Sequence, residues 1–137
     1  MVTNINFLTN KIIMKNYLLS TLIFLFALSA KSQSVVYKSD QWGNTKLYNS
    51  WTTALDNPIL EKAKIVQTDK TITATFGKRI LKYTIVSSEK IGSYVTKFKV
   101  KMNEKIYLIK LHYNSGKYTF ICDNEWAVGG ITDMSSE

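Results

Sequence analysis

From Ala63 onward, apolar and polar residues alternate along short segments rich in Val, Ile, Thr, Tyr and Phe. A period of two places successive side chains on opposite faces of a strand. Turn-forming residues interrupt the segments about every ten residues, which is typical of an antiparallel meander. The pattern predicts strands at 64–68, 71–76, 79–88, 93–102, 105–114, 117–122 and 126–131.

Three short turns, Gly77-Lys78, Asn103-Glu104 and Ser115-Gly116, fix the register of the hairpins that they join. A slip of one residue would move the apolar side chains of a strand to its other face. The turns predict the facing pairs Ile72–Tyr83, Ala74–Leu81, Val100–Tyr107, Phe98–Ile109, Thr96–Leu111, Tyr94–Tyr113, Tyr113–Tyr118, Leu111–Phe120 and Ile109–Cys122. Nearly all of these residues are apolar or aromatic, so the hairpins share one core face.

The segment before Ala63 gives weaker indications. "SVVYKSD" at 34–40 is typical of a first strand. Residues 46–55 have apolar residues at helical spacing but are rich in Tyr, Trp and Thr, and we predict a strand there, with a helix as the alternative. Near 57–63 we expect a short helix, because Asn57 can cap it and Pro58 suits a first helical position.

These segments together predict an all-β, single-domain fold with at most one short helix. About six to eight antiparallel strands must close into a small barrel or a strongly curved sheet to hide one apolar face. A two-sheet sandwich is the alternative, although short consecutive turns favour a meander over long crossovers. No motif points to a particular family.

The first 33 residues contain no Asp or Glu. Residues 14–16 form a short basic region, 17–28 an apolar stretch, and Ala30-Lys31-Ser32 a small-x-small cleavage site. The apolar stretch is shorter than the roughly 20 residues that span a bilayer. We therefore predict a signal peptide at 1–32, with Met14 as an alternative start, and a mature domain at 33–137 that is exported to the periplasm or beyond the cell. A membrane anchor is the alternative.

The formal net charge is +8, and three of the lysines lie in the predicted signal peptide. The mature domain is therefore moderately basic, which favours loose attraction to anions and does not specify a ligand. Nucleic acid is not an expected partner, because no recognised binding motif is present. Cys122 is the only cysteine, so the domain has no internal disulfide and must be stabilised by its core.

The sequence predicts no catalytic residue, cofactor or metal site. Cys122 and His112 would be the simplest nucleophile and base, but the predicted register places them on opposite faces of the sheet. Asp56, Asp123 and Glu125 could supply oxygen ligands, yet they lack the spacing of a calcium loop. An enzyme is therefore not the leading expectation.

Lysines occupy the outward positions of the strand predicted at 93–102. Lys97, Lys99 and Lys101 alternate with inward apolar residues, and the outward face of the same hairpins carries Lys110, Ile106, Leu108 and Ile121. We predict that these seven residues form a binding surface. The alternative is an ordinary solvated face, on which the lysine stems cover the aliphatic residues and the ammonium groups remain in water.

Burial in the core is the favoured interpretation of Trp42 and Trp51, and stacking on a flat ligand is the alternative. We expect a non-catalytic binding module for an anionic or amphiphilic partner, such as an anionic lipid, an acidic polysaccharide or an envelope protein. A small secreted hydrolase or an enzyme inhibitor is the alternative. A deep cavity lined by acids would favour the hydrolase, whereas a basic and aliphatic sheet face would favour binding.

Overall fold

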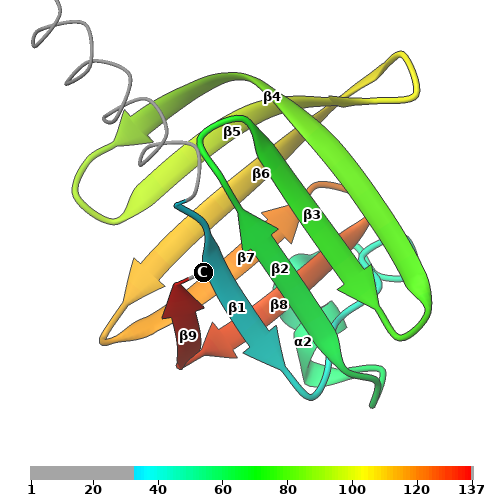
Figure 1. The fold of residues 1–137 in the computed structure, drawn as a ribbon. Coiled ribbons are helices and arrows are strands. Elements are labelled where there is room, and N and C mark those ends of the chain that lie inside the picture. Colours follow the sequence, from blue (N-terminus) through cyan, green and yellow to red (C-terminus); the bar gives the residue numbers. More distant parts are fainter. Residues whose placement is uncertain (1–32, 137) are drawn as a thin grey trace, which may run out of the picture. The chain divides into compact units, whose positions relative to one another are not determined.

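Residues 33–136 are described by a computed structural model, and they form nine strands and one short helix (Figure 1). The predicted signal peptide lies outside the described residues. The elements are, in chain order, β1 (Val35–Ser39), α2 (Trp51–Asp56), β2 (Ala63–Gln67), β3 (Thr71–Phe76), β4 (Arg79–Ile91), β5 (Val95–Met102), β6 (Lys105–Asn114), β7 (Lys117–Cys122), β8 (Trp126–Ile131) and β9 (Asp133–Ser136).

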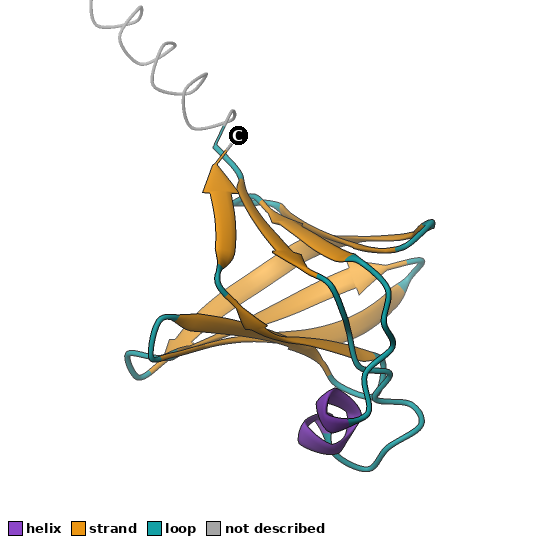
Figure 2. Ribbon diagram, turned by 90° about the horizontal axis from the view of Figure 1, so that it is seen from below, coloured by secondary structure: helices purple, strands orange, loops and turns teal. Residues whose placement is uncertain are grey.

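All nine strands belong to one antiparallel sheet with the order β8-β7-β6-β5-β4-β3-β2-β1-β9. Every strand from β1 to β8 pairs with its neighbours in sequence, as expected for a meander. Gly130, near the end of β8, has a positive φ of 62°, and after Ile131 the chain leaves β8 so that β9 pairs with β1. A bridge between Gly43 and Ala127 joins the two ends of the sheet again. The sheet is thus nearly closed into a barrel, and Figure 2 shows the strands around a common interior.

The predicted register of the hairpins is confirmed. Strand pairing joins Phe98 to Ile109 and Leu111 to Phe120, and the amide of Tyr113 donates to the carbonyl of Tyr94 at 2.8 Å. The β5–β6 turn has positive φ at Asn103 (51°) and Glu104 (66°), and the β6–β7 turn has the same feature at its two central residues. Two left-handed residues give a turn whose twist matches that of the flanking strands.

The structure has one strand more than the upper end of the prediction. The additional strand is β9, whose sequence "DMSS" has no apolar alternation and whose four residues are all exposed. It joins the sheet by strand pairing with β1, and because none of its side chains is buried, side-chain patterning could not reveal it. Strand β4 also continues to Ile91, which is past its predicted end.

The prediction of a strand at 46–55 is wrong, because the chain turns through 45–50 and forms α2 at Trp51–Asp56. The Ser50 hydroxyl caps this helix by accepting from the amide of Thr53 at 3.2 Å. Ala54 is completely buried and packs beside Gly43.

The predicted helix near 57–63 is also wrong. Ile59 instead pairs with Trp42, since the two residues exchange backbone hydrogen bonds of 2.8 and 3.1 Å. The bridge between Ile59 and Trp42 therefore prevails over the tendency of Asn57 and Pro58 to begin a helix.

Aromatic side chains fill the interior. Phe76, Tyr83, Phe120 and Trp126 are among the largest fully buried residues, and the indole Nε1 of Trp126 donates to the hydroxyl oxygen of Tyr83 at 3.0 Å. Smaller inward residues, including Val100, Ile109 and Cys122, complete the same cluster. The inward faces of the strands are thus committed to packing, and the candidate sites lie at the outer surface and at the seam between β1 and β8.

Candidate functional site

The outer face of β4, β5 and β6 carries a hollow of about 390 Å³. Its lining residues are Ser87, Glu89, Lys97, Lys99, Ile106, Tyr107 and Leu108. Four of the seven predicted binding residues are therefore brought together: two lysines from β5 and two aliphatic residues from β6. We call this region the lysine hollow.

Strand register explains the composition of the lysine hollow. Lys97 lies between Glu89 of β4 and Lys110 of β6, and Lys99 lies between Ser87 and Leu108. The β4–β5 pairing shifts between Ile85 and Ser87, which leaves Val86 as an extra residue. This bulge changes which β4 residues point outward and places Glu89 beside the lysines.

The lysines of this face differ in how they are neutralised. Lys101 forms an ion pair with Glu104 at 3.2 Å, and Lys110 lies 3.8 Å from the carboxylate of Asp123. Within residues 33–136, neither Lys97 nor Lys99 has a carboxylate within 4.0 Å. These two ammonium groups are therefore free of direct ion pairs, and together they outnumber the single carboxylate of the hollow, Glu89.

The aliphatic residues of the predicted surface separate into two groups. Ile106 is 53% exposed and Leu108 is partly exposed, so both can contact a partner. Ile121 is only 2% exposed. It lies beside Thr45 and Trp51, because the chain from 44 to 57 folds over the outer side of β7 and β8. Ile121 is therefore not part of the exposed face, and the strand pattern could not show that a loop covers it.

The two candidate stacking residues have different environments. Trp42 is 7% exposed, packs against Phe76 with ring centroids 4.5 Å apart, and donates from Nε1 to Glu61 at 3.3 Å. It belongs to the core, as the favoured interpretation held. Trp51 is 37% exposed on α2, and its ring centroid lies 6.0 Å from that of His112.

Cys122 and His112 point to opposite sides of the sheet, as predicted. Cys122 is fully buried opposite Ile109, and burial raises the pKa of its thiol to about 12. His112 lies opposite Thr119 on the other face, where partial burial, assisted by Lys110, lowers the pKa of its imidazole. The two groups therefore cannot act as a nucleophile and its base.

The acidic residues that could have held a cation are engaged or dispersed. Asp123 faces Lys110, and Glu125 forms an ion pair with Lys46 at 3.0 Å. In the described part of the chain, no three His, Cys, Asp or Glu side chains gather in a way that could hold a metal ion.

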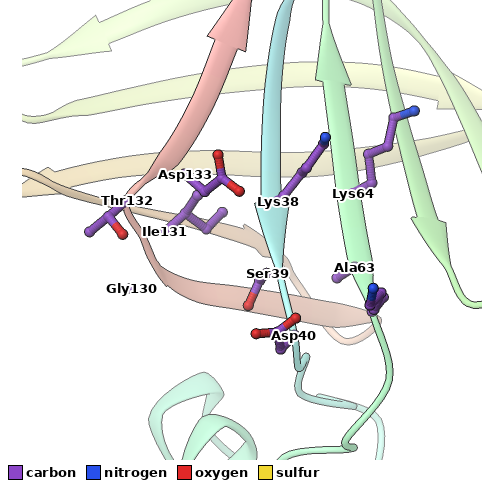
Figure 3. A pocket seen from close by; sticks show the side chains of 10 residues that line it. Lys38, Ser39, Asp40, Ala63, Lys64, Gly130, Ile131, Thr132 and Asp133 are labelled. Atoms are coloured by element: carbon purple, nitrogen blue, oxygen red, sulfur yellow. The ribbon is translucent and has the colours of Figure 1, made fainter.

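A second and larger pocket, of about 570 Å³, lies at the seam of the barrel (Figure 3). It is lined by Lys38, Ser39, Asp40, Lys62, Ala63, Lys64, Gly130, Ile131, Thr132 and Asp133. Three segments that are far apart in sequence build this seam pocket. Sequence reasoning missed it, because only the closure of the barrel brings these segments together and none of them carries a motif.

Comparison with protein-family models, with curated proteins and with solved structures finds no match to this chain. Over residues 33–136, no helix has the length and apolar character that crossing a membrane requires. The candidate sites therefore rest on the geometry of this chain alone.

Proposed function

We propose that this protein is an exported, non-catalytic binding module that holds an anionic amphiphile, namely an anionic lipid, at the lysine hollow. The observation that supports this proposal is the placement of Lys97 and Lys99, which lack carboxylate partners within the described residues, beside the exposed Ile106 and the partly exposed Leu108. Export is part of the proposal and is based on the acid-free leader with its small-x-small cleavage site.

The charge of the hollow favours an anionic headgroup. A lysine close to an anionic membrane surface contributes on the order of 1 kcal/mol to binding. Lys97 and Lys99 are available for this contact, whereas Lys101 and Lys110 would first have to give up Glu104 and Asp123. The interaction should weaken with added salt, because the Debye length falls from about 10 Å at 0.1 M to about 3 Å at 1 M.

The aliphatic residues favour a lipid over an acidic polysaccharide. A polysaccharide would use the ammonium groups but would gain little from Ile106 and Leu108. An acyl chain laid along these residues removes apolar surface from water, at roughly 25 cal/mol per Å² of buried area. The hollow, at about 390 Å³, is within the usual size range of small-molecule sites.

The proposal is tested by sedimentation of the purified protein with vesicles that contain an anionic phospholipid, and with zwitterionic vesicles. The test variant is Lys97→Gln/Lys99→Gln. Its matched control, Lys78→Gln/Lys117→Gln, removes the same charge from exposed positions outside the hollow. A third variant, Ile106→Ser, removes apolar contact area without changing the charge.

We expect wild type to sediment with anionic vesicles at low salt only. The hollow variant should bind at least about fivefold more weakly than the charge-matched control, and Ile106→Ser should also weaken binding. Equal loss in the two double variants would show that only net charge matters, and would contradict the proposed site. Unchanged binding by Ile106→Ser, together with capture by a soluble acidic polysaccharide that Lys97→Gln/Lys99→Gln abolishes, would assign the surface to a polysaccharide instead.

A further inference from the structure

The barrel does not close by continuous hydrogen bonding. Strand β1 pairs with β9 as far as Lys38 and Asp133, and the sheet ends meet again only at the Gly43–Ala127 bridge. Between these two points, residues 39–42 and 128–132 face each other across the seam without strand pairing. Backbone groups along such a gap that have no partner in the sheet can bind a ligand or water, whereas those of Trp42 are already bonded to Ile59.

Charged side chains of both signs surround this gap. Lys38 of β1 lies between Asp133 of β9 and Lys64 of β2 in the strand register. Asp40 and Lys62 complete the charged lining, and Figure 3 shows Asp133, Lys38 and Lys64 on three adjacent strands. Within residues 33–136, none of these five side chains forms an ion pair within 4.0 Å. The seam pocket thus holds three ammonium groups and two carboxylates that do not neutralise one another directly.

The seam pocket also has apolar and hydroxyl groups. Ala63 and Ile131 line it although they are only 3% and 2% exposed, so the pocket reaches down to the core. Thr132 contributes a hydroxyl from the bend between β8 and β9, and Ser39 contributes another, which donates to the carbonyl of Gln41 at 3.0 Å. The pocket volume, about 570 Å³, lies in the range of small-molecule sites.

We propose that the seam pocket binds an acidic sugar unit, meaning a ring that carries a carboxylate together with several hydroxyl groups. The carboxylate is held by the lysines of β1 and β2. The sugar hydroxyls donate to Asp40 and Asp133, which are acceptor-only groups when ionised. A simple inorganic anion would use the lysines but would leave the two carboxylates facing a like charge. This site is separate from the lysine hollow and does not depend on the function proposed above.

The test is a titration of the isotope-labelled, purified protein, followed by the chemical shifts of its backbone amides. Three probes are added in turn: digalacturonate, the neutral disaccharide lactose, and inorganic phosphate. We expect digalacturonate to shift the amides of residues 38–40, 62–64 and 130–133. Lactose and phosphate should bind at least about fivefold more weakly, because lactose lacks the carboxylate and phosphate lacks the hydroxyl-bearing sugar ring.

Variants separate the contributions of the two charges. Lys38→Gln/Lys64→Gln and, independently, Asp40→Asn should each raise the dissociation constant for digalacturonate about fivefold or more. Lys78→Gln/Lys117→Gln, at exposed positions that line neither the seam pocket nor the lysine hollow, should leave it unchanged. All variants should keep the amide spectrum of a folded protein, since the substituted side chains are exposed. Phosphate binding as tight as that of digalacturonate, or shifts centred on residues outside the seam pocket, would overturn the proposal.

Discussion

At the scale of single residues, the alternation along β5 separates packing from surface chemistry. Phe98 and Val100 are 5% and 0% exposed in the core, whereas their neighbour Lys99 is exposed. The period of two is therefore enough to assign each side chain to a face. It is not enough to show what else covers that face, as Ile121 demonstrates.

Two substitutions in β5 test this division. Phe98→Ala should lower the free energy of unfolding by roughly 3–5 kcal/mol, because it removes a buried aromatic side chain and leaves a cavity. Lys99→Ala should change it by no more than about 0.5 kcal/mol, as expected for a surface position. Urea unfolding curves of the two variants provide the measurement. A larger loss for Lys99→Ala would mean that the two faces are exchanged.

Buried ionisable groups in the core predict a loss of stability at alkaline pH. Burial raises the pKa of the Cys122 thiol to about 12 and also raises the pKa of the Tyr83 and Tyr37 hydroxyls. Each group therefore binds its proton more tightly in the folded state than in the unfolded state. The stabilisation is complete below the unfolded pKa, near 8.5 for Cys and 10 for Tyr, and declines as the pH rises above those values.

Urea unfolding at pH 7 to 11 checks this expectation. The free energy of unfolding should be constant up to about pH 8 and should fall above it. Cys122→Ala is the control, and its stability should decline less steeply. Before unfolding, the Cys122 thiol should react with a thiol reagent at pH 8 far more slowly than it does in urea. Rapid labelling of the folded protein would show that the thiol is not buried.

At the scale of elements, α2 and its flanking loop cover the outer side of β7 and β8. The contact is close at Gly43, where a Cβ atom would lie 2.9 Å from the backbone carbon of Ala54. At Gly129 the obstacle is the end of the Leu55 side chain, at 2.6 Å from the added Cβ. Backbone cannot move aside as readily as the end of a flexible side chain.

Gly43→Ala should therefore destabilise the protein more than Gly129→Ala. We expect a loss of about 1–3 kcal/mol at Gly43, in the range of overpacking substitutions, and a smaller loss at Gly129. Thermal or urea unfolding of both variants measures the difference. Equal effects would mean that the loop containing α2 is not held against the barrel at Gly43.

The prediction from sequence succeeded where the fold is local and failed where it depends on tertiary closure. Turn chemistry and alternation predicted the strands from β2 to β8 and the register of three hairpins. They missed β9, whose four exposed residues show no apolar alternation and which joins the sheet by strand pairing with β1. At 46–55 they favoured a strand and gave a helix only as the alternative, whereas the cap at Ser50 and the burial of Ala54 stabilise α2 at the end of this segment.

The two candidate sites differ in the same way: one lies on consecutive strands and could be predicted, and the other depends on closure of the barrel. Lys97, Lys99, Ile106 and Leu108 were predicted to share a surface, and the structure brings them together because they lie on consecutive strands. The seam pocket could not be predicted, because it exists only where the first and last strands of the sheet meet.

At the scale of the whole molecule, apolar and aromatic side chains fill the interior of the barrel, so the groups that could bind a partner lie on its outer surface. The described acids lie mostly in turns and loops, whereas many lysines lie within strands. Exposed aliphatic residues outside the lysine hollow offer competing apolar contacts, and Leu47 and Leu60, at 72% and 83% exposed, are the most prominent. A binding test must therefore report where the ligand lies as well as whether it binds.

Titration of methyl-labelled protein with a short-chain anionic phospholipid, below its micelle concentration, tests the proposed function most directly. The methyl signals of Ile106 and Leu108 should shift, and the shifts should shrink when salt is raised from 0.1 to about 1 M. The methyl signals of Leu47 and Leu60 should stay unchanged, as should those of Ile131 in the seam pocket. Shifts centred on Leu47 and Leu60, or none at Ile106 and Leu108 at low salt, would contradict the assignment of the lysine hollow as the lipid site.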